Sequence, residues 1–243
     1  MPARLSVVRV ASVYFTREHL RAPLTISLLV ALPAVFVVAS AAVLNSFARA
    51  LGGDVAGHAA TALGAGWSAA FLAGAFGFFQ TVSSRDADYR LARAGFGAMR
   101  TAASRLVSAF TLSLVVTLAA LAALRLKQPT PHLWHITVAI LAYAVVYLGI
   151  GTAIGVLIRD ELAGSLAVVF VFILDVFSGP GMAPAPTGLG QILTPSRYAG
   201  ELLLRAGAGA SSPAGDWRQA GLSVAIALGV ALLVFWRAAR RRT

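Results

Sequence analysis

The sequence predicts an all-α integral membrane protein, and three observations support that fold class. Of the 243 residues, 58% are hydrophobic and only 12% are charged. Apolar runs of spanning length recur along the chain, and a spanning helix needs about 20 such residues. Short connectors that carry the arginines separate these runs, which leaves no window for a second soluble domain. We therefore treat residues 1–243 as a single transmembrane domain.

An interfacial helix is expected at residues 1–23, which hold four arginines and are too polar to span a bilayer. Apolar side chains gather on one side of this helix and polar side chains on the other. Helices of this kind lie in the plane of the membrane surface.

Six spans are expected in the rest of the chain. They cover residues 24–44, 62–82, 106–124, 136–158, 162–177 and 219–236. Pro33 is expected to kink the first span. Glycines in the second span, together with the pair Gly151 and Gly155 in the fourth, permit close contact between helices.

The orientation follows from the basic residues, which concentrate in the cytoplasmic segments of membrane proteins. With the N-terminus inside, the inner segments hold 14 of the 20 basic residues and the outer segments hold 6. We therefore expect a multi-pass protein of the plasma membrane with both termini in the cytoplasm. Lys127 is the only lysine, and this bias toward arginine is typical of a GC-rich, bacterial genome.

Residues 83–105 form a long connector that this orientation places in the cytoplasm. Asp86 and Asp88 precede its arginines, and an acidic start is typical of a helix N-terminus. Gly95 and Gly97 are expected to end this short coupling helix, after which the chain continues into the third span. The alternative is a solvated, charged loop.

The connector at residues 178–217 is 40 residues long, rich in proline and rather apolar, and it lies on the outer side. A structureless loop of that length inside a compact domain is improbable. Irregular backbone at membrane depth needs shielding by protein or a wet cavity. We therefore expect a re-entrant helical hairpin.

This arrangement resembles the membrane subunit of type 2 ABC (ATP-binding cassette) transporters, the ABC-2 exporter permeases. The interfacial helix, six spans, inner charged connector and long outer insert carry the resemblance along nearly the whole chain. Its most specific part is Ser178-Gly179, then prolines, then Thr194-Pro195-Ser196-Arg197-Tyr198 before a short helix. Thr194 stands where the family has an asparagine.

The resemblance implies an efflux permease that pairs with a second permease copy or a paralogue and is driven by a separate cytosolic ABC ATPase. The residues implied for ATPase coupling are Asp86, Arg90, Leu91, Ala94 and Gly95. Those implied for the outer gate or translocation pathway are Asp175, Ser178, Gly179, Pro195, Tyr198 and Glu201, with outer re-entrant helices at residues 189–193 and 198–204. ATP and Mg²⁺ would bind the partner, so this chain needs no cofactor.

The residues themselves leave two roles open for Asp175, which lies at the end of the fifth span. It either lines a substrate or proton path or caps the turn at Ser178. Glu201 is expected to pair with Arg197 or Arg205, since both lie at helical spacing. His132 and His135 flank Trp134 and are expected to form part of an interfacial aromatic belt rather than a metal site.

Several other functions are excluded by what the sequence lacks. A phosphate-binding loop needs a lysine after a glycine-rich stretch, and Lys127 has no such context. The chain has no cysteine for thiol chemistry, and no basic face with interleaved aromatics for nucleic acid. We therefore expect no enzyme activity in this chain. The alternatives to an exporter are an ion-coupled secondary transporter and a membrane scaffold without transport activity.

Overall fold

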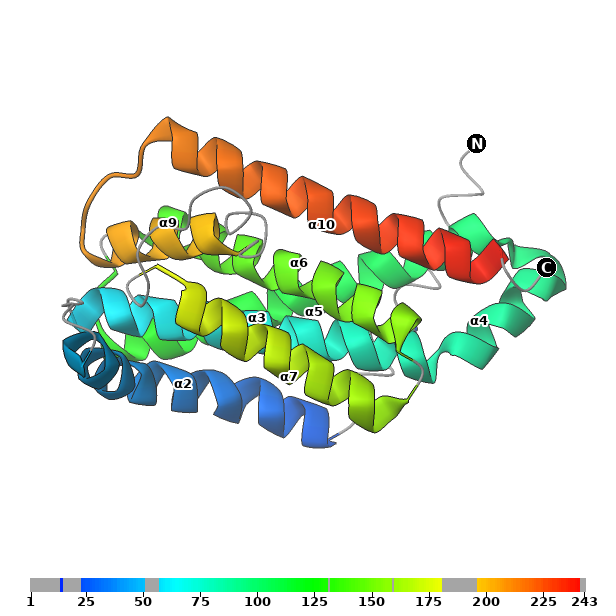
Figure 1. Ribbon diagram of the computed structural model, residues 1–243, viewed down its shortest axis with the longest axis horizontal. Helices are drawn as coiled ribbons and strands as arrows, with labels where there is room; N and C mark the ends of the chain where they lie inside the picture. Colours follow the sequence, from blue (N-terminus) through cyan, green and yellow to red (C-terminus); the bar gives the residue numbers. More distant parts are fainter. Residues whose placement is uncertain are drawn as a thin grey trace.

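The computed structural model describes Tyr14 and residues 23–50, 57–130, 132–158, 160–180 and 196–240. All regular structure in these ranges is helical, and the long helices form an elongated bundle (Figure 1). They are α2 (Pro23–Ala50), α3 (Gly57–Ser83), α5 (Ala98–Lys127), α6 (Leu133–Leu157), α7 (Glu161–Ser178) and α10 (Ala214–Arg240). The shorter ones are α4 (Arg85–Leu91), the π-helical turn η1 (Ala92–Phe96) and α9 (Arg197–Gly207).

Five helices, α3, α5, α6, α7 and α10, are long and apolar enough to cross a membrane. They correspond to the predicted second to sixth spans, and most run beyond the predicted bounds. The reason is that an apolar run marks only the hydrocarbon part of a helix. The predicted first span lies in α2, whose apolar part is the shorter stretch Ala31–Ser46. The described ranges thus show five candidate spans, and the sixth remains a prediction.

Two other predictions fall at the ends of the described ranges. The interfacial helix at residues 1–23 lies outside them, apart from the exposed, helical Tyr14 and the start of α2. Pro33 is buried within α2, which continues through it as a single helix.

α3 is the central helix, because it contacts α2, α5, α6, α7 and α9 and is buried along most of its length. Its closest approach is to α6. A Cβ atom added to Gly151 would lie 2.0 Å from the carbonyl oxygen of Gly74, and one added to Gly77 would lie 2.7 Å from that of Leu148. The predicted role of glycines in close helix contact is therefore confirmed for this pair of helices.

α7 and α10 lie on the outside of the bundle and expose apolar side chains. On α10 these are Leu222, Ile226, Val230 and Leu233, and on α7 they include Leu166, Phe170, Ile173 and Phe177. The spacing of three to four residues places each set along one side of its helix. Such continuous apolar stripes are suited to lipid contact in a membrane-spanning bundle.

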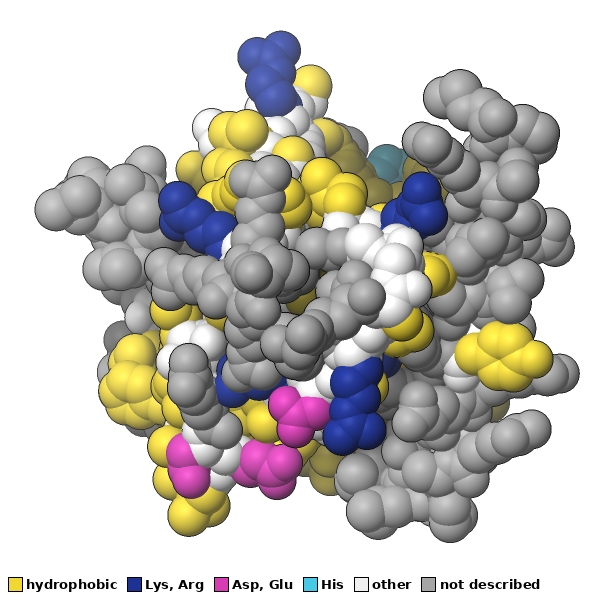
Figure 2. Space-filling view, turned by 90° about the vertical axis from the view of Figure 1, so that its right-hand side faces the viewer, with side chains coloured by type: hydrophobic (Ala, Val, Ile, Leu, Met, Phe, Trp, Pro, Cys, Tyr) yellow, Lys and Arg dark blue, Asp and Glu magenta, His cyan; other side chains and the backbone are white. Residues whose placement is uncertain are grey.

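The two ends of the bundle differ in what they carry. α4 and the C-terminal end of α10 lie at one end, and α9 lies at the other (Figure 1). The α4 end presents basic and acidic side chains among apolar ones (Figure 2). Of the predicted insert, residues 178–180 and 196–217 fall in the described ranges and include α9; the predicted helix at residues 189–193 lies outside them.

Gly151→Ala tests the contact between α3 and α6. We expect it to lower the free energy of unfolding by about 1–3 kcal/mol, because the added methyl group meets backbone that has no rotamer to adjust. Thermal unfolding in detergent measures the change. Gly229→Ala is the matched control, since nothing lies within 4 Å of its added Cβ. It should be neutral or stabilise α10 by up to about 1 kcal/mol, and equal destabilisation by both changes would contradict the contact.

Candidate functional site

α9 is an amphipathic helix that lies against α3 and α6 at the end of the bundle away from α4. Its apolar side chains at helical spacing are buried, namely Ala199, Leu202, Leu203 and Ala206. Leu203 packs directly over Gly66 of α3, where an added Cβ would be only 2.3 Å from its Cδ1 atom. Glu201 and Arg205, on the other side, remain partly or fully exposed. α9 is therefore docked by one apolar face, and it covers the short helix expected at residues 198–204.

Asp175 lies in the last turn of α7 and is only 4% exposed. Its Oδ2 atom accepts a hydrogen bond of 2.7 Å from the Tyr147 hydroxyl of α6. The Ser196 hydroxyl, at the start of α9, donates to the same oxygen. The carboxyl group of Asp175 thus joins α7 to α6 and α9, and its predicted roles, a substrate or proton path or a cap for the turn at Ser178, stay predictions.

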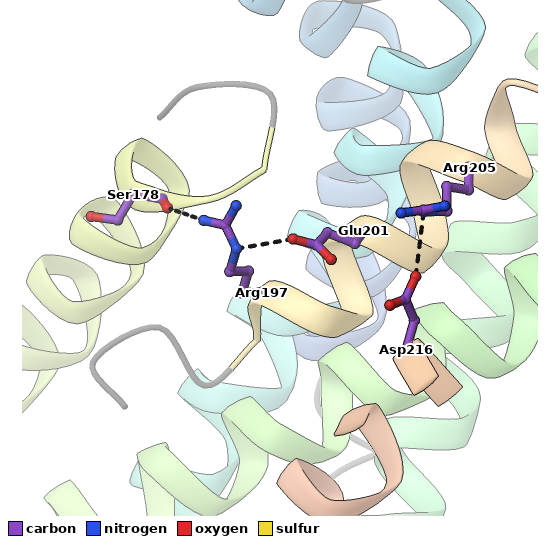
Figure 3. A network of polar contacts seen from close by, with 5 residues as sticks. All are labelled: Ser178, Arg197, Glu201, Arg205 and Asp216. Carbon is purple, nitrogen blue, oxygen red and sulfur yellow. Dashed lines mark hydrogen bonds and ion pairs between the residues drawn. The ribbon is translucent and has the colours of Figure 1, made fainter. Parts of the chain in front are cut away.

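Arg197 forms a second connection between α9 and α7 (Figure 3). Its Nε donates to Oε1 of Glu201 at 2.9 Å, and its Nη1 lies 3.5 Å from the carbonyl oxygen of Ser178. The predicted ion pair of Glu201 is thus confirmed with Arg197. Arg205 pairs instead with Asp216 at the start of α10, at 3.3 Å.

Most of the predicted outer residues therefore lie around one end of α9. Gly179 is buried, Ser178 is half-buried, and Tyr198 packs against the apolar core. Glu201 is joined to Ser178 through Arg197. Pro195 lies outside the described residues.

The predicted coupling residues lie at the opposite end, on α4 and η1. Asp86 is in the first turn of α4, Arg90 is exposed in its last turn, and Leu91 is half-buried. Ala94 is exposed, and Gly95 has a φ of 89°. Gly97 has a φ of 85°. Only glycine adopts this conformation readily, so the predicted break between α4 and α5 is confirmed.

Arg85 is a further residue at this end that the sequence did not indicate. Its Nη2 atom donates a hydrogen bond of 2.6 Å to the carbonyl oxygen of Gly155, near the C-terminal end of α6. The last carbonyl groups of a helix have no partner within the helix, and a guanidinium group can supply one. Arg85 therefore fixes the start of α4 against α6.

Tyr143, Tyr147 and Ser196 are site residues that sequence reasoning missed. We call them, together with Asp175, the Asp175 cluster. The sequence offered one indication of this cluster, two tyrosines four residues apart in an otherwise apolar helix. A buried tyrosine hydroxyl usually has a hydrogen-bond partner, so the pair indicates a polar group nearby. The partner could not be named, since Asp175 is 28 residues from Tyr147 in the sequence.

His132 and His135 lie next to one another at the start of α6. His132 and His135 have ring centroids 5.5 Å apart, and Nε2 of His132 lies 3.2 Å from the carbonyl oxygen of Gly209. Among the described residues, no group of three or more His, Cys, Asp or Glu could hold a metal ion. Trp134 between them is 73% exposed, as in an interfacial belt.

The fold and these sites define an all-α protein of the multi-pass membrane class, with polar connections concentrated at the two ends of the bundle. Comparison with models of known protein families gave no match, and comparison with curated protein sequences gave none either.

Tyr147→Phe tests the hydrogen bond to Asp175. We expect a loss of about 1–3 kcal/mol in the free energy of unfolding, because a buried acceptor loses one of its two donors. Tyr143→Phe is the matched control. The Tyr143 hydroxyl is buried but donates no hydrogen bond to Asp175, so its removal should cost less than that of the Tyr147 hydroxyl. Unfolding curves that rank the two variants in the opposite order would contradict the assignment.

Proposed function

We propose that the chain is the membrane-spanning permease subunit of an ATP-driven ABC exporter. It would move a substrate outward with ATP hydrolysed by a separate cytosolic ATPase. The observation that carries the proposal is the placement of α4–η1 and α9 at opposite ends of one bundle (Figure 1). A permease needs these two elements apart, one to receive motion from the ATPase and one to gate the exit.

The geometry of α4–η1 supports a coupling role. α4 follows closely on α3, and two glycines with positive φ, Gly95 within η1 and Gly97 after it, break the helix before α5. The exposed part of this segment includes Asp86, Arg90 and Ala94. A partner that moves it would act on α3 and α5 directly and on α6 through the Arg85 contact.

The geometry of α9 supports a gating role. α9 is held by polar contacts at both of its ends, through Arg197 to α7 and through Arg205 to α10. Such contacts can be broken and remade when the helices move, whereas the apolar core of the bundle cannot. In this proposal Asp175, Ser178, Gly179, Pro195, Tyr198 and Glu201 form the outer gate of the pathway.

The proposed assembly contains two permease subunits and two ATPase subunits. The second permease is another copy of this chain or a paralogue, and both sit in a bacterial plasma membrane with their termini in the cytoplasm. ATP and Mg²⁺ belong to the ATPase. An ion-coupled transporter is the second candidate, and the buried carboxyl group of Asp175 is the observation that favours it.

Arg90→Glu tests the proposed coupling surface. The permease is co-expressed with the soluble protein of the neighbouring reading frame, which should carry a phosphate-binding loop. We expect the wild-type chain to co-purify with it and to stimulate ATP hydrolysis. Arg90→Glu should lower the amount of bound ATPase about tenfold or more, because a like charge would replace a complementary one at the contact.

Arg237→Glu is the matched control for this experiment. Arg237 is also exposed and lies at the same end of the bundle, but on α10. It should leave the amount of bound ATPase unchanged. Proton-driven flux in vesicles without ATP, with no association of the two proteins, would overturn the proposal in favour of an ion-coupled transporter.

A further inference from the structure

The carboxyl group of Asp175 has an unequal set of hydrogen bonds. Oδ2 accepts from both Tyr147 and Ser196. Oδ1 is buried and has no hydrogen-bond partner in the described part of the chain. A carboxylate shares its negative charge between both oxygens, so an ionised Asp175 would leave half of that charge without a donor. Burying a charged oxygen without a hydrogen-bond donor costs free energy.

No positive charge compensates Asp175 among the described residues. From α9, Arg197 is its basic neighbour, and its guanidinium group is engaged with Glu201 and the Ser178 carbonyl. From α6, the titratable groups are Tyr143 and Tyr147, neither of which carries a positive charge in any state.

Toward α2 and α3, the surroundings of Asp175 are aromatic. Phe172, one turn earlier on α7, packs against Tyr147, Phe36 and Phe71, with ring centroids 5.8, 6.2 and 5.3 Å away. Trp67 of α3 is a neighbour of the Tyr143 side chain. These groups offer no cation and little access for water, so an ionised Asp175 would be a buried, unpaired charge.

The hydrogen-bond pattern fits a protonated carboxyl group. In such a group one oxygen is a carbonyl acceptor and the other is a hydroxyl group. In a protonated Asp175 the two donors make Oδ2 the carbonyl oxygen, which leaves Oδ1 as the position of the proton. A metal ion would need several ligands, and the described residues hold no group of three or more His, Cys, Asp or Glu side chains that could bind one.

We propose that Asp175 is a proton-binding site and that the proton on Oδ1 holds α9 docked against α7. Loss of the proton would create an unpaired charge between α6, α7 and α9. Water or a cation must then reach the carboxylate, and the Ser196 end of α9 is the element that can move to admit it. The inference concerns the docking of α9 and stands independently of the proposed export function.

Infrared spectroscopy tests the protonation state directly. The purified chain at neutral pH should show a carbonyl stretching band of a protonated carboxylic acid. This band should be absent in Asp175→Asn, whose amide can keep the two bonds from Tyr147 and Ser196. Asp160→Asn is the matched control, because Asp160 caps the start of the same helix but is exposed, and it should retain the band. A wild-type spectrum without the band, or a band that persists in Asp175→Asn, would overturn the proposal.

A cysteine reporter tests the movement of α9, and the natural absence of cysteine leaves no background. Ala199 is 3% exposed on α9, so Ala199→Cys should resist a water-soluble maleimide while α9 is docked. Its labelling rate is divided by that of the same cysteine in an Asp175→Asn background. In this ratio the intrinsic labelling rate of the thiol, which also changes with pH, cancels.

We expect this ratio to rise above neutral pH with a limiting slope of about tenfold per pH unit, as for the release of one proton. Ala210→Cys is the control reporter, because Ala210 is exposed and should label at every pH. A ratio that stays flat until the protein unfolds would show that α9 does not respond to Asp175 and would overturn this part of the proposal. A ratio that changes with the Na⁺ concentration instead of the pH would show that Asp175 binds a metal ion, and would overturn the proposed proton site.

Discussion

The backbone contact between α3 and α6 is the constraint on which the other contacts depend. In lipid the hydrophobic effect does not drive helices together, so close packing of small residues takes its place. Gly151 lets α6 approach the carbonyl group of Gly74 more closely than any side chain would permit. α6 then carries groups for both ends of the bundle. Tyr147 reaches Asp175 near α9, and the Gly155 carbonyl accepts from Arg85 at the start of α4. These two positions are eight residues apart, about 12 Å along one rigid helix.

The α9 end of the bundle shows how a short helix can be held against longer ones. α9 is attached by its apolar face to α3 and α6 and by polar groups at its two ends to α7 and α10. Backbone that is irregular at this depth needs such shielding by neighbouring protein. The apolar contact supplies the stability, while the polar contacts at Asp175 and Arg197 specify where α9 lies.

The parts of this structure that the sequence predicted are those set by neighbours along the chain. Apolar runs identified the helices, Gly95 and Gly97 identified a break, and spacing of four residues limited the partner of Glu201 to Arg197 or Arg205. The partners of Asp175 and Arg205 come from other helices, and finding them requires knowing which faces meet. Arg85 could not be assigned for the same reason, since its acceptor is a backbone carbonyl 70 residues away. Such an acceptor has no signature in the amino-acid sequence.

The central claim is that α4 and α9 lie on opposite sides of the membrane, and thiol labelling in sealed, oriented vesicles tests it most directly. Single cysteines at Arg90, on α4, and at Ala210, just after α9, report the two ends in a chain that has no other cysteine. A membrane-impermeant maleimide should modify Arg90→Cys only from the cytoplasmic side and Ala210→Cys only from the outer side. Modification of both positions from the same side would contradict the account.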